Sequence, residues 1–407
     1  MAAMLLGMLG SLIQAKYICP EDMGAFRTFG ILAGYLTFLH LGVLDGLQRE
    51  IPIQIGRGNK LKAEQAASAC LAWISFISLA CGALFLALAL RAAFNKEWMG
   101  FLGWLSYVPV IVMTFYGGYL STTFRTGHQF VELSRTSIIK AIAETLILPL
   151  LPILGYYGMC LRTALGSTAN LYYLHKWRPM KVRAILDWSK FREVIRVGLP
   201  LSGIGYIATA LWASVEATLV LGWFELKVLG LYSVAVLGRT IVSQLAANIN
   251  QVITVKIFEQ YGRTKSVEDC IRLIYRPIIL SFLGSIPLVI AGWLLLPHVI
   301  LLIVPNYLEA VPMAQLMLLM LPITFLRLPS SIPWAMGRWF DCLVPVAVGF
   351  IVFTGLAWFL HRLGYGVLSV VLASIIGTLF NISGYFLLIR RLLIQERNSG
   401  SKPPSCK

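Results

Sequence analysis

The chain has 407 residues, of which 58% are hydrophobic and only 13% are charged. A soluble domain carries about 25% charged residues, so this composition excludes a soluble enzyme and predicts an integral membrane protein. Lys and Arg outnumber Asp and Glu by 34 to 18, which gives a formal net charge of +16. Because the basic residues are spread between apolar segments and form no basic domain, we expect no nucleic-acid partner.

The apolar segments predict an all-α polytopic membrane protein with about twelve transmembrane helices. A helix needs about 20 mainly apolar residues to cross the hydrocarbon core. The first predicted span is short, the fifth and sixth are joined tightly at Gly155, and the tenth holds four prolines and is the most prone to bend. The predicted spans are 2–17, 25–44, 66–90, 99–124, 136–155, 157–175, 197–222, 229–254, 273–296, 310–334, 340–361 and 366–389.

The basic residues of the loops predict the orientation of the chain. Lys and Arg gather after the second, fourth, sixth, eighth and tenth spans and in the C-terminal tail. The opposite loops hold only scattered cases, such as Lys96, Lys227 and Arg362. Cytoplasmic loops carry the excess of Lys and Arg, so we expect both termini in the cytoplasm.

A shift of about 206 positions brings the two halves of the chain into register without a gap. Residues 23–26 then fall on 229–232, and Gln54, Gly56 and Arg57 fall on Gln260, Gly262 and Arg263. Six spans per half give both halves the same orientation, so we expect two six-helix lobes related by a pseudo-two-fold axis along the membrane normal. The predicted divisions are an N-terminal lobe (1–180), a cytoplasmic amphipathic linker (181–196), a C-terminal lobe (197–392) and a cytoplasmic basic tail (393–407).

Several charged residues fall inside the predicted spans, where a charge requires a partner or a water-filled cavity. Arg239 lies about ten residues into the eighth span, and it either faces a cavity or pairs with Glu216 of the seventh. Lys140 and Glu144 are four residues apart on one helix face, as a structural pair or a proton relay. Snorkelling to an interface and a functional role both explain the remaining arginines, Arg27, Arg162 and Arg327.

The chain lacks the motifs of soluble and membrane enzymes. It has no GxxxxGK[ST] phosphate loop, no HExxH and no GxSxG. Its seven cysteines show no CxxC spacing and mostly lie in apolar runs, as small buried residues do. We therefore expect no enzyme activity, no cofactor and no metal site.

Four segments resemble Wzx-type polysaccharide flippases. Residues 20–26 and 41–49 are similar to the opening of this family, and residues 196–201 and 229–233 are similar to its second half. The family belongs to the superfamily that includes multidrug/toxin extruders and the lipid II flippase. One departure is the first span, which lacks the usual basic cytoplasmic head.

The resemblance implies translocation of undecaprenyl-pyrophosphate-linked oligosaccharide repeat units across a bacterial inner membrane by alternating access. Such transport supplies surface polysaccharides such as the O-antigen of lipopolysaccharide. Partners would be the lipid-linked oligosaccharide, membrane lipids, H+ or Na+, and a polysaccharide polymerase. Arginine suits a pyrophosphate, which makes Arg239, Arg27, Arg162 and Arg327 the candidate substrate-binding residues. Glu144 and Glu216 are the candidate ion-coupling residues.

The sequence leaves two other functions open. An ion-coupled drug or organic-cation antiporter on the same fold would need an acid-dominated site, whereas the predicted spans hold at least as many Arg and Lys as Glu. A polytopic glycosyltransferase or O-antigen ligase would carry a large outer loop with catalytic groups. The longest outer loop here, 297–309, holds Glu309 as its one acid.

Overall fold

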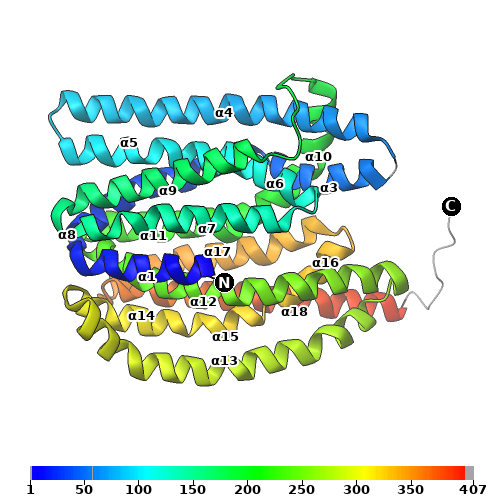
Figure 1. Ribbon diagram of the computed structural model, residues 1–407. Helices are drawn as coiled ribbons and strands as arrows, with labels where there is room; N and C mark the ends of the chain where they lie inside the picture. Colours follow the sequence, from blue (N-terminus) through cyan, green and yellow to red (C-terminus); the bar gives the residue numbers. More distant parts are fainter. Residues whose placement is uncertain (1, 57, 399–407) are drawn as a thin grey trace. The chain divides into compact units, whose positions relative to one another are not determined.

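The computed structural model describes residues 2–56 and 58–398, and all the regular structure in this part of the chain is helical (Figure 1). Arg57 of the expected repeat, and the part of the expected basic tail beyond residue 398, lie outside the described residues. The chain divides into two compact units, Met1–Thr218 and Leu219–Lys407. Each unit is built around its own packed helices.

The first unit begins with three helices of 14 to 17 residues, followed by the long helix α4 and its partner α5. Its elements are α1 (Ala2–Tyr17), α2 (Pro20–Leu36), η1 (Thr37–His40), α3 (Val43–Gly56), α4 (Lys60–Phe94), α5 (Trp98–Val112), η2 (Met113–Gly117), α6 (Gly118–Thr126), α7 (Phe130–Leu146), η3 (Leu148–Leu150), α8 (Leu151–Leu154), α9 (Tyr156–Lys176), α10 (Trp188–Tyr206), η4 (Ile207–Leu211) and α11 (Trp212–Trp223), of which α11 runs past the division at residue 218.

The second unit holds four long helices and one broken segment. Its elements are α12 (Leu226–Thr264), α13 (Val267–Ile303), η5 (Pro305–Ala310), α14 (Val311–Leu318), α15 (Met320–Phe325), η6 (Leu328–Ser330), α16 (Ser331–Ala335), α17 (Trp339–Arg362) and α18 (Leu368–Asn398).

The helices are those of a multi-pass membrane protein. Eight helical segments of the described chain are long and apolar enough to cross a membrane, and the bent pair Pro20–His40 and Val43–Pro52 raises the number to nine. This is fewer than the twelve predicted spans, although helices occupy each predicted range. The other three ranges coincide with α1, which has 16 residues, and with α9 and α12.

Helices are interrupted at the glycine and prolines where the sequence predicted a joint or a bend. Helix α9 follows α8 through Gly155 alone, which adopts a φ of +51°. The tenth predicted span is divided into α14, α15, η6 and α16, as its four prolines indicate, because each proline removes a backbone donor. By contrast, α13 keeps Pro277, Pro287 and Pro297 inside one continuous helix.

The helix starts of the two halves repeat with a nearly constant offset. Three elements of the first half each have a counterpart about 206 positions later, as expected for an internal repeat. The fourth predicted span is interrupted by the π-turn η2, and its counterpart in the second half is interrupted between α14 and α15. The three pairs of starting residues are Pro20 and Leu226, Lys60 and Val267, and Trp98 and Pro305.

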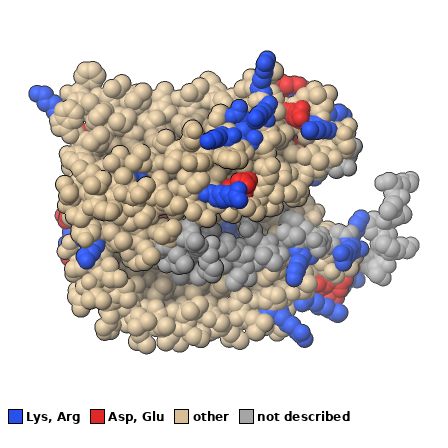
Figure 2. Space-filling view, viewed as in Figure 1, with Lys and Arg blue, Asp and Glu red and all other residues tan. Residues whose placement is uncertain are grey.

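The predicted amphipathic linker has no regular secondary structure up to Asp187, and α10 begins at Trp188. Asp187 caps this helix by accepting hydrogen bonds from the backbone N–H groups of Ser189 and Lys190, as N-cap residues do. Ile185, Leu186 and Trp188 are exposed, and basic side chains gather at this end of the first unit (Figure 2). Exposed apolar groups among cations suit the headgroup layer of a membrane.

A contact between two glycines fixes α10 against the start of α3. A Cβ atom at Gly198 would collide with the carbonyl oxygen of Gly42, and a Cβ at Gly42 would collide with that of Gly198. Gly42 also has a φ of +75°, which L-residues with a side chain rarely adopt. The two backbones therefore touch directly, and neither position has room for a side chain.

We expect the Gly198→Ala variant to be destabilised by about 1–3 kcal/mol, because the added methyl group overpacks this contact. The matched control is Gly203→Ala in the same helix, where an added Cβ meets nothing within 4 Å. The measurement is SDS-induced unfolding of the purified proteins in mixed micelles, followed by tryptophan fluorescence. Equal stability of the two variants would contradict the close contact.

Candidate functional site

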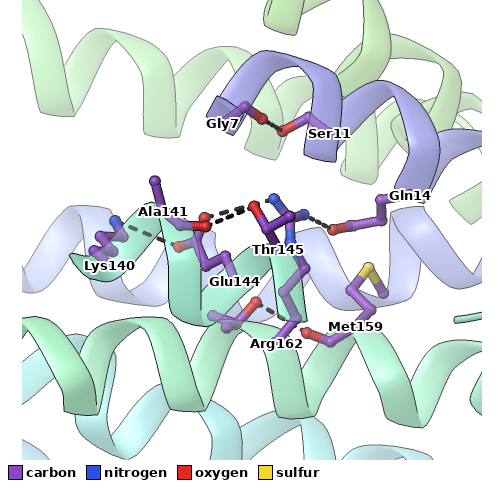
Figure 3. A network of polar contacts seen from close by, with 10 residues as sticks. Gly7, Ser11, Gln14, Lys140, Ala141, Glu144, Thr145, Met159 and Arg162 are labelled. Atoms are coloured by element: carbon purple, nitrogen blue, oxygen red, sulfur yellow. Dashed lines mark hydrogen bonds and ion pairs between the residues drawn. The ribbon is translucent and has the colours of Figure 1, made fainter. Parts of the chain in front are cut away.

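Three helices of the first unit place a cluster of charged and polar side chains in a mostly apolar surrounding. Arg162 on α9 donates a hydrogen bond to the side-chain oxygen of Gln14 on α1. Its Nη2 lies 3.5 Å from Oε2 of Glu144 on α7, and Nζ of Lys140 lies 3.7 Å from the other oxygen of that carboxylate. Figure 3 shows these contacts converging on Glu144 and Arg162. We call these four residues the charge cluster.

The charge cluster runs from the interior of the unit toward its surface. The exposed fraction of the side chain is 8% for Arg162, 19% for Glu144 and 45% for Lys140. Removing a guanidinium and a carboxylate from water costs several kcal/mol per ion unless they are paired. Two cations share one carboxylate, so the cluster carries a net positive charge. The Nε of Arg162 is buried and has no hydrogen-bond partner within the described residues.

Glycines on two of the helices make room for the charge cluster. A Cβ at Gly10 of α1 would lie 2.7 Å from Nη2 of Arg162. A Cβ at Gly166 of α9 would lie 2.7 Å from Oε1 of Glu144. Both distances are shorter than van der Waals contact, so larger residues at these positions would displace the charged groups.

The sequence predicted part of this cluster. The Lys140–Glu144 ion pair is confirmed, and the two residues lie one helical turn apart, as their spacing indicated. Snorkelling to an interface does not apply to Arg162, since the residue is buried. The partnership of Arg162 with Gln14 was not predicted, because 148 positions separate the two residues. The one signal was a glutamine inside the mainly apolar first span.

The second candidate acid, Glu216, is also buried and engaged. It lies on α11 with 1% of its surface exposed. The indole Nε1 of Trp212, one turn earlier, donates a 3.1 Å hydrogen bond to its carboxylate. Glu216 is therefore held by Trp212, the residue that directly follows the π-turn η4.

Arg27 lies half-buried on α2 of the first unit. Within the described part of the chain, its guanidinium has no hydrogen bond and no ion pair. A cation in this position needs water or an anion to solvate it. Of the four candidate residues in this unit, the structure brings Glu144 and Arg162 into contact.

The second unit holds the other two candidate arginines. Arg239 is half-buried on α12, and its Nη1 lies 3.8 Å from the sulfur of Met320 at the start of α15. Arg327 is half-buried between α15 and η6, at a break of the tenth predicted span. Its side chain forms no ion pair with any residue that the structure describes. Both arginines are thus associated with the broken segment. The sequence placed Arg327 in this span, but it did not reveal the contact of Arg239 with Met320.

A long helical chain with buried charges on several helices is the general pattern of a membrane transporter. No protein-family model matches the sequence, and no curated protein matches it either. Solved structures do resemble it over nearly its whole length. The similarity to a multidrug resistance MATE family transporter of the MOP superfamily in an inward-facing conformation has a TM-score of 0.70, at 16% identity over 97% of this chain and 96% of that chain.

Two further structures resemble the chain closely in fold. One is the outward-facing conformation of a multidrug resistance MATE family transporter, with a TM-score of 0.65 and 18% identity over 98% of this chain and 95% of that chain. The other is a MOP superfamily transporter from Pyrococcus furiosus, reported with a binding pocket of reverse polarity. Its TM-score is 0.68, at 16% identity over 97% of this chain and 94% of that chain. The chain therefore has the fold of MOP superfamily transporters.

We expect the Glu144→Gln variant to be destabilised by about 3 kcal/mol, because Arg162 would remain buried without its counter-charge. The double variant Glu144→Gln, Arg162→Gln should regain part of this loss. SDS-induced unfolding in mixed micelles measures both effects.

The matched control is Glu132→Gln on the same helix, whose partner Arg135 is exposed. Exposed pairs contribute less than about 1 kcal/mol, so this variant should unfold close to the original protein. Equal losses at Glu132 and Glu144 would show that the charge cluster does not hold the helices together.

Proposed function

We propose that the chain is a transporter of the Wzx flippase branch of the MOP superfamily. It moves undecaprenyl-pyrophosphate-linked oligosaccharide repeat units across the bacterial inner membrane for surface polysaccharide synthesis. Twelve spans form two six-helix lobes related by a pseudo-two-fold axis along the membrane normal, and both termini lie in the cytoplasm. The fold supports transport, since proteins that share it have been solved in inward-facing and outward-facing conformations.

The observation that supports an anionic substrate is the balance of charges among the candidate residues. Glu144 is held by two cations, and Glu216 accepts a hydrogen bond from Trp212. Arg27 and Arg327, in contrast, form no ion pair within the described residues. The acids are engaged while these arginines keep their charge for a ligand, which favours an anionic substrate. Guanidinium groups bind phosphate oxygens through paired, charge-assisted hydrogen bonds.

Each candidate residue has a role in this proposal. Arg239, Arg27 and Arg327 bind the pyrophosphate or acidic sugars. Arg162 joins them when Glu144 releases it, because binding of H+ or Na+ at Glu144 weakens the ion pair. Glu216 is the second ion-coupling residue. Membrane lipids and a polysaccharide polymerase are the expected partners, and no chemical step or cofactor is involved.

The alternative is an ion-coupled antiporter of drugs or organic cations. Its support is the likeness in fold to multidrug resistance MATE family transporters. The Pyrococcus furiosus transporter, with its pocket of reverse polarity, shares the same fold. The fold thus accommodates pockets of either polarity, and the residues decide the substrate. The engaged acids of this chain favour the anionic substrate.

We expect the reconstituted protein to equilibrate a fluorescent undecaprenyl-pyrophosphate oligosaccharide between the leaflets of vesicles. Arg27→Gln and Arg239→Gln should each slow this exchange about tenfold or more, because each removes a charge-assisted hydrogen bond to the substrate. The measurement is the fraction of lipid accessible to an impermeant quencher over time.

The matched control is Lys96→Gln, which removes an exposed cation in the turn between α4 and α5. It should exchange the lipid at the original rate. Proton-driven transport of tetraphenylphosphonium without any lipid exchange would instead establish the antiporter.

A further inference from the structure

An apolar groove lies on the second unit, between α13, η6 and α18. It has a volume of about 350 Å³. Ile274 and Ile389 are buried and form its floor, whereas Tyr275 and Phe386 are 63% and 45% exposed at its rim. Pro329 of η6 lines the groove, where the broken tenth span replaces a regular helix with a short turn. The groove is therefore open to the surroundings of the helices.

One arginine lines the groove, and two more follow lining residues in the sequence. Among the described residues, Arg390 of α18 is the one charged residue that lines it. Arg276 and Arg391 directly follow lining residues along α13 and α18, and all three arginines are exposed. None of the three has a hydrogen bond or an ion pair from its side chain within the described residues. By contrast, the nearby Arg272 pairs with Glu268 at 2.8 Å.

Basic side chains gather at the end of the second unit where α13 begins and α18 ends (Figure 2). The apolar groove opens at this end, and Arg390 in its lining adds a positive charge. This combination matches a ligand with an apolar chain and an anionic head. A peptide or a free sugar would lose its hydrogen bonds to water in such a groove, because its lining offers almost no polar groups.

We propose that this groove binds one acyl chain of an anionic membrane phospholipid, with the lipid phosphate at Arg390. The volume falls in the range of small-molecule sites. Anionic lipids attract basic residues at the membrane surface, and no described carboxylate neutralises the charge of Arg390, which lines the groove. The lining of this groove includes none of the candidate transport residues among the described part of the chain, and the lipid proposal does not depend on the transport proposal.

The test is native mass spectrometry of the full-length protein in micelles that contain phosphatidylglycerol or phosphatidylcholine of the same chain length. The original protein should retain phosphatidylglycerol in preference. Arg390→Gln should lower retention of phosphatidylglycerol about fivefold, the contribution of one cation near the surface. Retention of phosphatidylcholine should fall less, because the choline group already offsets the charge of its phosphate. Ile278→Trp fills the groove and should lower the retention of both lipids.

Two control variants match these changes outside the groove. Arg391→Gln removes the neighbouring exposed cation, and Leu387→Trp adds the same bulk to an exposed position of α18. Both should retain phosphatidylglycerol like the original protein. Thermal unfolding checks the fold of each variant, and Leu393→Trp fills the groove from α18 if Ile278→Trp does not fold.

Three results would overturn the proposal. The first is an equal loss of phosphatidylglycerol in Arg390→Gln and Arg391→Gln. The second is full lipid retention in a folded variant whose groove is filled. The third is displacement of the retained phospholipid by an undecaprenyl-pyrophosphate lipid at equal concentration, which would assign the groove to the transported lipid. This retention experiment does not depend on lipid exchange between leaflets. Failure of the lipid-site proposal can therefore be distinguished from failure of the transport proposal.

Discussion

The contact between the guanidinium of Arg162 and the carboxylate of Glu144 is the constraint on which the helix packing of the first unit depends. In a bilayer, apolar faces gain little by leaving lipid for a neighbouring helix, so polar contacts and close packing must specify which helices meet. Arg162, Glu144 and Gln14 come from α9, α7 and α1. Separating these helices would leave a buried charge without its partner, and this penalty makes one arrangement much more stable than the others.

Small residues supply the second requirement, a close approach of backbones. In the first unit Gly42 and Gly198 bring α10 onto the start of α3. In the second unit α17 and α18 meet through Gly349 and Gly377, where a Cβ on either glycine would lie 2.7 Å from the carbonyl oxygen of the other. Dispersion forces act over short distances only, so these glycines strengthen packing by removing side chains. Polar contacts select the partners, and glycines set the separation.

The sequence predicted features that arise from neighbouring residues. The prolines of the tenth span, the joint at Gly155 and the Lys140–Glu144 pair each depend on a few successive positions, and the structure confirms them. It could not predict Gln14 as the partner of Arg162, nor the groove between α13 and α18, because these depend on helices far apart in the chain. Helix α9 coincides with the sixth predicted span, although it is not among the helices that are long and apolar enough to cross a membrane by themselves. It carries Arg162, whose charge is solvated by contacts with α1 and α7.

The sign of the charges on the helices is more informative about the substrate than the fold is. An arginine in apolar surroundings must be solvated by water, a carboxylate or an anionic ligand. Arg162 has a carboxylate, and its charge is partly neutralised in place. Arg27 and Arg327 have no carboxylate partner among the described residues, so they must be solvated by water or by an anionic ligand. A cationic drug would increase the repulsion at these positions, whereas a pyrophosphate would relieve it. The same argument applies at the surface, where Arg390 borders an apolar groove and a lipid phosphate can provide the missing negative charge.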